Sequence, residues 1–246
     1  MAALRFTTSW DDGHPLDLRV AELLASHGFA GTFYVPRANR EGRPVLSTDE
    51  LRRLGAGFEI GGHSLDHVPL TGLSPAERDH QLRDGKHRVE DELGRAISGF
   101  CYPGGAHDQS LRRAVQAAGF AYARTVTNLS LDPPRDRYQL GTTLQLYPHA
   151  RLTYLTNYVR RGDWRARVLP LAICLRGGSL DASLEHVLRF AAARGGVFHI
   201  WGHSWEIEAE GLWGALDRLL RLAGGLVARE HRLSNAEVAA GANHAQ

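Results

Sequence analysis

The sequence lacks the features of a disulfide-rich secreted protein and of a membrane protein. Cysteine occurs only at positions 101 and 174, which is too few for a disulfide framework, and no Cys-x-x-Cys motif is present. We therefore expect Cys101 and Cys174 to be buried free thiols. No uninterrupted apolar run approaches the length of a membrane span, and the chain does not start with a charged segment followed by an apolar one. These absences predict a cytoplasmic protein with no transmembrane segment.

The sequence also has no large excess of positive or negative charge. The chain of 246 residues has 29 Lys and Arg against 27 Asp and Glu, a formal net charge of +2, which argues against nucleic acid as a partner. Hydrophobic residues make up 43% and charged residues 23%, a globular composition. No repeat, low-complexity block or linker divides the chain, so residues 1–238 are interpreted as one domain. The small and polar residues 239–246 are expected to form a flexible C-terminal tail.

Short apolar segments alternate with helical patterns. Strands are expected at residues 4–9, 30–35, 58–60, 97–102, 120–126 and 197–201. Helices are expected at residues 16–27, 48–54, 74–93, 108–118, 184–193 and 212–222. Between residues 128 and 176 the pattern is harder to assign, since 151–161 favours a helix and 168–175 fits either a strand or a buried helix. The alternation predicts an α/β fold with parallel strands and suits a barrel, with the active site where the strands end.

Polar residues gather where four of these strands end. Asp11 and Asp12 follow the first strand; such a pair suggests that one carboxylate binds a cation while the other moves protons, although Asp-Asp-Gly also fits an ordinary turn. His63 and His67 are four residues apart, so a helical turn would place both rings on one side. Two imidazoles and a carboxylate are a common set for a catalytic divalent metal, although 13 histidines also make chance pairs common.

The order and spacing of these segments resemble the polysaccharide deacetylase domain, also called the NodB homology domain of carbohydrate esterase family 4. The matching segments are Ser9–Gly13, His63–His67, Cys101–Gly105 and Ile200–His203. The resemblance extends over nearly the whole chain. It implies a distorted (β/α) barrel, for which we expect seven strands.

The resemblance also implies roles for individual residues. Asp12, His63 and His67 would hold one divalent metal ion, with zinc expected first and cobalt, nickel, manganese or iron as alternatives, because such a ligand set accepts several ions. Asp11 would be the general base and His203 the general acid.

Other residues at the same strand ends are candidates for substrate contacts. The backbone N–H of Tyr102, beside Pro103, is a candidate to stabilise the oxyanion. Trp205 is expected to stack on a sugar ring. His14 is either a substrate contact or a turn residue. His199 competes with His203 for the acid role, but a position inside its strand favours a core or supporting role for it.

The sequence departs from the family pattern in its third and fourth motifs. The arginine that orients the base in the third motif is Cys101 here, and the fourth motif has no clear match. Arg124 either supplies the missing positive charge near Asp11 or is a surface arginine. Glu206 either orients His203 or is simply solvated.

The leading hypothesis is a metal-dependent hydrolase that removes an N-acyl group, in first place N-acetyl, from an amino sugar, an oligosaccharide or a lipid-linked glycan. One alternative is the same fold acting on a small cyclic amide or a lipid-linked formamido sugar. Another is an inactive domain that binds carbohydrate or metal. Asp11 beside a metal-binding set argues against the inactive domain, because a binding module needs no base. The absence of a leader favours a soluble precursor or a lipid-linked sugar over a cell-wall polymer.

Overall fold

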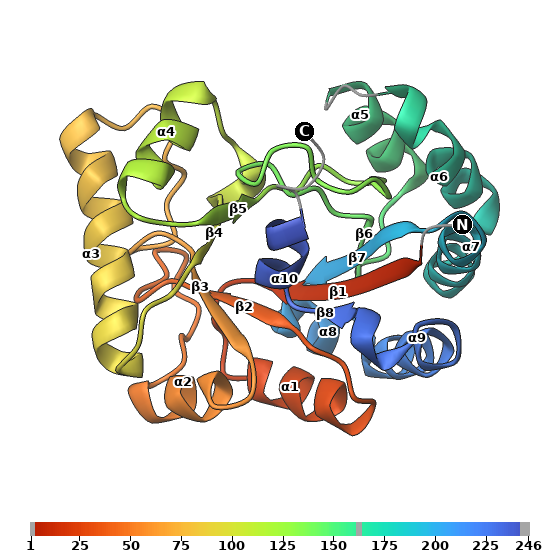
Figure 1. The fold of residues 1–246 in the computed structure, drawn as a ribbon, viewed down its shortest axis with the longest axis horizontal. Coiled ribbons are helices and arrows are strands. Elements are labelled where there is room, and N and C mark those ends of the chain that lie inside the picture. The colour runs from red at the N-terminus through yellow and green to blue at the C-terminus, as the bar shows by residue number, and fades with distance from the viewer. Residues whose placement is uncertain (1–2, 161–163, 242–246) are drawn as a thin grey trace.

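A curled parallel sheet forms the centre of the computed structural model, which describes residues 3–160 and 164–241. Seven strands follow one another in the order β5-β4-β3-β2-β1-β7-β6, and helices surround them (Figure 1). These strands are β1 (Leu4–Trp10), β2 (Thr32–Val35), β3 (Glu59–Gly62), β4 (Gly99–Cys101), β5 (Tyr122–Arg124), β6 (Leu144–Gln145) and β7 (Gly196–Gly202). The prediction of a distorted α/β barrel with seven strands is confirmed. A short additional strand, β8 (Arg232–Leu233), pairs with β1 and was not predicted.

The pairing of β1 with β7 positions the catalytic loops. The two strands are in parallel register from Leu4 opposite Gly196 to Trp10 opposite Gly202. The backbone N–H of Asp11 then donates to the Gly202 carbonyl at 3.0 Å. The residues that follow the two strands therefore leave the sheet side by side, as expected for the carboxyl ends of parallel strands.

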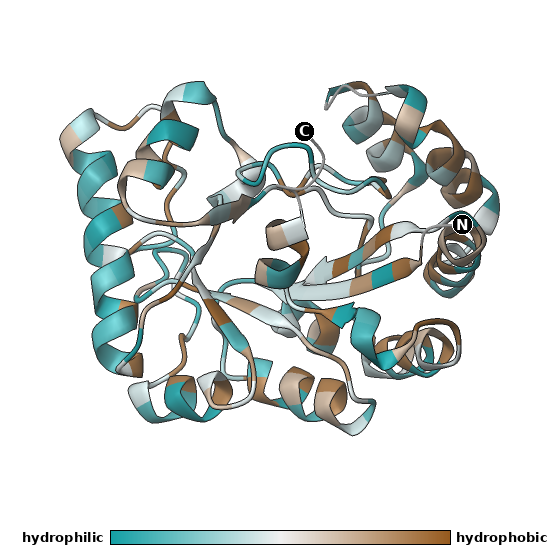
Figure 2. Ribbon diagram, in the orientation of Figure 1, coloured by the Kyte–Doolittle hydropathy of each residue, from teal (hydrophilic) through white to brown (hydrophobic). Residues whose placement is uncertain are grey.

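Helices cover the outside of the sheet (Figure 1), and hydrophobic and hydrophilic residues alternate along most of them (Figure 2). They are α1 (Asp17–Ser26), α2 (Thr48–Gly55), α3 (Pro75–Leu93), α4 (Gln109–Ala117), α5 (Arg151–Arg160), α6 (Trp164–Gly177), α7 (Leu180–Arg194), α8 (Ser204–Ala209), α9 (Trp213–Leu226) and α10 (Asn235–Ala240), with 3-10 turns at Pro103–Gly105 and Arg229–His231. Ser74 and Glu77 form the capping box that starts α3. The ambiguous stretch 168–175 lies in a helix, α6.

An irregular segment before β6 forms hydrogen bonds with both β5 and β7. Its Leu140 N–H donates to the Ala123 carbonyl of β5 at 3.0 Å, and its Thr143 N–H donates to the His199 carbonyl of β7 at 2.8 Å. These partners are distant in sequence, so no local sequence pattern could predict the pairing of this segment. The same reason explains why β6, only two residues long, was not predicted.

The predicted C-terminal tail is wrong at its start. Residues 239 and 240 lie in α10, where Ala239 is buried. Asn235 anchors this helix, because its side chain accepts a hydrogen bond from Thr7 at 2.8 Å and donates one to Tyr34 at 3.0 Å. Residues 242–246 lie outside the described part of the chain.

The structure also describes the two cysteines and the apolar content of the helices. Cys101 and Cys174 are buried and free, as predicted. Within residues 3–160 and 164–241, no helix combines the length and apolar character that crossing a membrane requires.

Candidate active site

A cavity of about 350 Å³ lies where β1, β3, β4 and β7 end. Most of the site residues predicted from the sequence line it, namely Asp11, Asp12, His63, His67, Tyr102, Pro103, His203 and Trp205. The other described lining residues are Glu41, Arg43, Pro69, Gly104, Val126 and Trp201. The sheet therefore gathers the four motif segments at one place, as the parallel-strand argument predicted.

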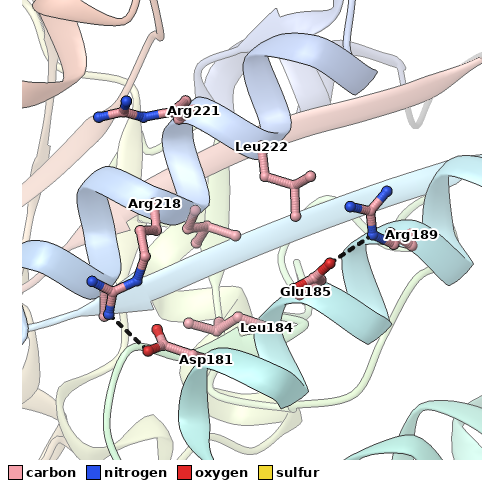
Figure 3. Close-up of a pocket in the computed structure, with 9 residues that line it drawn as sticks. Asp181, Leu184, Glu185, Arg189, Arg218, Arg221 and Leu222 are labelled. Carbon is pink, nitrogen blue, oxygen red and sulfur yellow. Dashed lines mark hydrogen bonds and ion pairs between the residues drawn. The ribbon is translucent and has the colours of Figure 1, made fainter.

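A hollow of similar volume, about 360 Å³, lies between α7 and α9 (Figure 3). Its charged side chains pair with one another: Arg218 lies 2.7 Å from Asp181, and Arg189 lies 2.9 Å from Glu185. None of the described residues that line it is a histidine or a cysteine. We therefore place the chemistry in the cavity at the strand ends.

Asp12, His63 and His67 bring three possible ligand atoms within 4.8 Å of one another. Nε2 of His67 lies 3.0 Å from Oδ1 of Asp12, and Nε2 of His63 lies 3.7 Å from the same oxygen. This oxygen is buried and has no hydrogen-bond partner among the described residues. Leaving a buried carboxylate oxygen without a partner is costly. The three atoms therefore fit a bound divalent cation.

The two histidine rings meet through a loop. β3 ends at Gly62, and the backbone then takes left-handed conformations at Ser64 (φ 59°) and His67 (φ 54°). The ring centroids of His63 and His67 lie 4.9 Å apart. The predicted helical turn is therefore wrong, although the two rings do lie together.

His63 can offer only one nitrogen to a metal. Its Nδ1 lies 2.8 Å from the Cys101 carbonyl, and since a carbonyl only accepts, Nδ1 must donate the proton. The lone pair is then on Nε2, the atom near Asp12. Burial lowers the pKa of His63 to about 4, so the ring is neutral at pH 7, as a metal ligand must be.

A second close group, formed by Asp11, His63 and Cys101, fits a cation less well. The Arg124 guanidinium already binds Oδ1 of Asp11. Burial raises the pKa of the Cys101 thiol, which keeps it protonated and a poor ligand. We therefore assign the metal-binding role to the Asp12 group.

Asp11 is held by a fully buried arginine. Arg124 forms an ion pair with its carboxylate and also lies over the Trp201 ring, with the guanidinium carbon 4.8 Å from the ring centroid. Burial raises the pKa of Asp11, but Arg124, His63 and His203 outweigh burial and leave that pKa below its ordinary value. Asp11 is therefore ionised at neutral pH. The prediction that Arg124 supplies a positive charge near Asp11 is confirmed, and the surface-arginine alternative is wrong.

His203 is the last member of a chain of hydrogen bonds. Its Nδ1 lies 2.7 Å from Oε2 of Glu206, which accepts a second hydrogen bond from the Gln145 amide at 3.0 Å. The side-chain oxygen Oε1 of Gln145 in turn lies 2.8 Å from Nε2 of His149. The Trp205 ring stacks on the His203 ring, with centroids 5.3 Å apart. The prediction that Glu206 orients His203 agrees with this geometry, which leaves Nε2 of His203 to carry a proton toward substrate.

Burial alone would lower the pKa of His203. The hydrogen bond to Glu206 and the negative charges of Asp12 and Asp11 outweigh burial, and the pKa is raised. The ring therefore stays protonated to higher pH than an ordinary histidine, which is the state that a general acid needs.

His199 is unsuited to the acid role. Its Nδ1 lies 3.0 Å from the Gly141 carbonyl and its Nε2 lies 2.8 Å from the Ser9 hydroxyl. Nδ1 must donate to the carbonyl, so Nε2 accepts from the hydroxyl and the ring is neutral. Burial lowers the pKa of His199 to about 3. This agrees with a supporting role in the core.

We expect the substitution Glu206→Gln to shift the alkaline limb of the activity profile to lower pH. Glutamine keeps an acceptor for Nδ1 of His203 but removes the charge that raises the pKa, so the acid form is lost at lower pH. The acidic limb, set by Asp11, should not move. The measurement is kcat/KM against pH, with Glu210→Gln, exposed at the end of α8, as the control. An unchanged alkaline limb would contradict this role of Glu206.

Tyr102 does not offer the free backbone N–H that we expected for the oxyanion. That N–H donates to the Arg124 carbonyl at 3.3 Å, because the parallel pairing of β4 and β5 extends to Cys101 opposite Arg124 and uses the next N–H for its last hydrogen bond. The phenol hydroxyl donates to the Tyr138 carbonyl at 3.1 Å. Tyr102 therefore lines the cavity with its ring.

His14 is not among the described residues that line the cavity. Its Nδ1 accepts a hydrogen bond from the Leu16 N–H at 3.2 Å, so it stabilises the turn before α1. The turn interpretation of His14 therefore agrees with the structure.

Trp205 has a second contact that the sequence did not suggest. Its indole N–H donates to Oδ2 of Asp12 at 3.0 Å, which fixes the carboxylate that faces the two histidines. Arg43, also not predicted, lies over the Trp205 ring with its guanidinium carbon 3.6 Å from the centroid. Trp205 lies in α8 and Arg43 lies in the segment before α2, so the two residues are far apart in sequence and no local pattern could predict this contact.

Among the described residues, the fold and the site combine a curled parallel sheet, an Asp-His-His cluster, a buried carboxylate paired with Arg124, and a histidine paired with Glu206. Residues 5–123 match the family model described as Polysaccharide deacetylase. Over these residues the chain matches the polysaccharide deacetylase family, as the motifs predicted.

Known relatives agree with this assignment. The Bacillus subtilis protein YxkH, named as a polysaccharide deacetylase, is 20% identical over 116 residues, which cover 47% of this chain and 39% of that protein. The match thus spans less than half of the curated relative. The chitin deacetylase of the fungal pathogen Colletotrichum lindemuthianum has a TM-score of 0.61 at 18% identity over 97% of this chain and 91% of its own. A family 4 carbohydrate esterase from Streptomyces lividans, solved with acetate, has a TM-score of 0.57 at 16% identity over 91% of this chain and 88% of its own. These two structures share the fold over most of the chain.

Proposed function

We propose that this protein removes an acetyl group from the amide nitrogen of an amino sugar, with one divalent ion held by Asp12, His63 and His67. The observation that carries the proposal is the ion pair between Asp11 and the buried Arg124 beside this ligand set. A domain that only binds sugar or metal needs no ionised base at that place, and burying an unused ion pair is costly.

Amide hydrolysis requires a proton acceptor for water and a proton donor for the leaving amine. Asp11 is ionised and acts as the acceptor, with Arg124 fixing one of its oxygens. His203 is protonated and donates from Nε2, because Glu206 holds its Nδ1. A divalent ion bound to the Asp12 group would polarise the acyl oxygen and make the attacking water more acidic.

The aromatic side chains of the cavity suit a sugar substrate. Trp201, Trp205 and Tyr102 all line it and give it an apolar wall that suits the apolar side of a pyranose. The expected stacking of a sugar on the Trp205 ring is not available in this arrangement, because His203 and Arg43 already lie against that ring. The names of the solved relatives, a chitin deacetylase and a carbohydrate esterase, support the same substrate class. We therefore propose short N-acetylglucosamine oligomers as the first substrates to test.

The test is acetate release from such oligomers, followed with a coupled assay. We expect release by protein loaded with zinc or cobalt, loss of release after chelation, and recovery when the ion is added back. Formate release from an N-formyl sugar, or opening of a small cyclic amide, with no acetate from oligomers would overturn the substrate. Hydrolysis of none of these amides by protein that holds its ion would overturn the enzymatic proposal.

A further inference from the structure

Helices α5 and α6 carry an apolar surface away from the catalytic cavity. Six large apolar side chains of these helices are exposed: Leu152, Leu155, Val159, Trp164, Val168 and Leu169. We call them the α5–α6 face. Figure 1 places the two helices side by side at the outer edge of the molecule, and Figure 2 shows apolar stretches along α6. Exposed apolar patches of this kind mark interaction sites.

The apolar residues of α5 form a stripe on its outer side. Leu152, Leu155 and Val159 have helical spacing and so share one side of the helix, and Leu152 is 71% exposed. Tyr154 is buried, so it lies on the opposite side of α5, which faces the protein. A surface helix ordinarily turns its apolar stripe toward the core, so the outward stripe indicates a second apolar environment.

The charge of the two helices is all of one sign. Arg151–Arg160 and Trp164–Gly177 contain five arginines and no Asp or Glu, a formal charge of +5. Since the whole chain is formally +2, the rest of the chain is formally −3. Arg167 is buried, and the other four arginines of the two helices, Arg151, Arg160, Arg165 and Arg176, are exposed.

We propose that the α5–α6 face docks the protein on a membrane that contains anionic phospholipid. The exposed arginines would bind headgroup phosphates, while the leucines, Val159 and Trp164 enter the boundary between headgroups and acyl chains. Helices that combine exposed apolar residues with exposed arginines, and that contain no Asp or Glu within Arg151–Arg160 and Trp164–Gly177, are suited to this position. A second copy of the chain fits less well, because a symmetric contact would set the same arginines against one another.

The docking surface is connected in sequence to the catalytic acid. Gln145, whose amide holds Glu206 beside His203, lies shortly before α5 begins at Arg151. Docking would therefore hold the protein at the membrane surface through helices that follow Gln145 in sequence. If the proposed deacetylation is correct, a sugar carried on a lipid becomes a substrate class to test, and this last step rests on that proposed function.

The test is sedimentation of the full-length protein with vesicles, which requires no substrate and so does not depend on the proposed function. We expect binding to vesicles of phosphatidylcholine mixed with phosphatidylglycerol and little binding to pure phosphatidylcholine. Raising the salt from about 0.1 M to about 1 M should weaken binding, because the Debye length falls from about 10 Å to about 3 Å.

Two pairs of variants separate charge from apolar contact. Arg151→Gln with Arg160→Gln should lower the partition coefficient about 30-fold, from about 1 kcal/mol for each arginine. Leu155→Gln with Val159→Gln should lower it about tenfold or more, and glutamine is a good helix former, so α5 should persist. Arg53→Gln with Arg113→Gln, exposed on α2 and α4, should bind as the wild type does.

Three results would overturn the proposal. One is the absence of binding to the anionic vesicles. Another is equal loss of binding in the control pair and the α5–α6 pairs. The third is a wild-type dimer that becomes a monomer when Leu155→Gln and Val159→Gln are introduced together, because this result would assign the α5–α6 face to a second copy.

Discussion

Replacing Asp11 by Asn is expected to lower kcat for amide hydrolysis by about a thousandfold while the bound ion is retained. Asparagine has nearly the same shape but cannot accept the proton of water. The ligand atoms of Asp12, His63 and His67 are unchanged by the substitution. Metal content should therefore separate this variant from one that has lost the centre.

The substitution also leaves Arg124 buried without its counter-charge, which should cost about 3–5 kcal/mol of stability. The assay therefore belongs well below the melting temperature of the variant. The double variant Asp11→Asn with Arg124→Met removes both charges and should recover part of the stability without recovering activity. Asp91→Asn, exposed on α3, is the control. Near-normal turnover in a folded Asp11→Asn protein would show that Asp11 is not the base.

Replacing His203 by Ala is expected to separate amide substrates from activated esters. The amine of an amide must be protonated as it leaves, whereas an aryloxide leaves without help. Hydrolysis of N-acetylglucosamine oligomers should fall about a hundredfold or more, and hydrolysis of a nitrophenyl acetate should fall less than about tenfold. Only a residue that acts as an acid on the leaving group produces this difference.

The experiment compares kcat/KM for the two substrates in each protein. His186→Ala, exposed on α7, is the matched control. Equal losses on both substrates would assign His203 to binding or to the metal environment rather than to proton donation.

Neighbouring strands and their loops were predictable from local patterns. β1, the two carboxylates after it and the histidines after β3 each lie within a short segment whose apolar and polar residues indicate a strand and a loop. The Ser74 capping box fixed the start of α3 for the same reason. Parallel pairing then brings these segments to one edge, whereas the choice of Asp12, His63 and His67 as the ligand set came from the resemblance to the deacetylase family.

Contacts between distant segments were less predictable. Arg124 and Asp11 are 113 residues apart, and two alternatives for Arg124 stayed open until the structure placed it beside the carboxylate. Gln145 and His149 were missed because β6 is stabilised by β7 rather than by its own sequence pattern. The free N–H expected at Tyr102 was wrong because strand pairing continues past the end of β4. The cytoplasmic location stays a prediction.

Ion stoichiometry is the most direct test of the account, because every proposed step depends on the Asp12 centre. Elemental analysis of the wild type after equilibration with zinc or cobalt should give about one ion per chain. Asp12→Asn is the variant of choice, since Asp12 has a φ of 77°, a conformation that Asn tolerates and Ala does not. We expect its affinity for the ion to fall more than about a hundredfold, because removing even a residue that only supports a ligand costs up to about that much. The affinity of the control Asp132→Asn should stay unchanged. An ion-free wild type, or an Asp12→Asn protein that binds as the wild type does, would contradict the central claim.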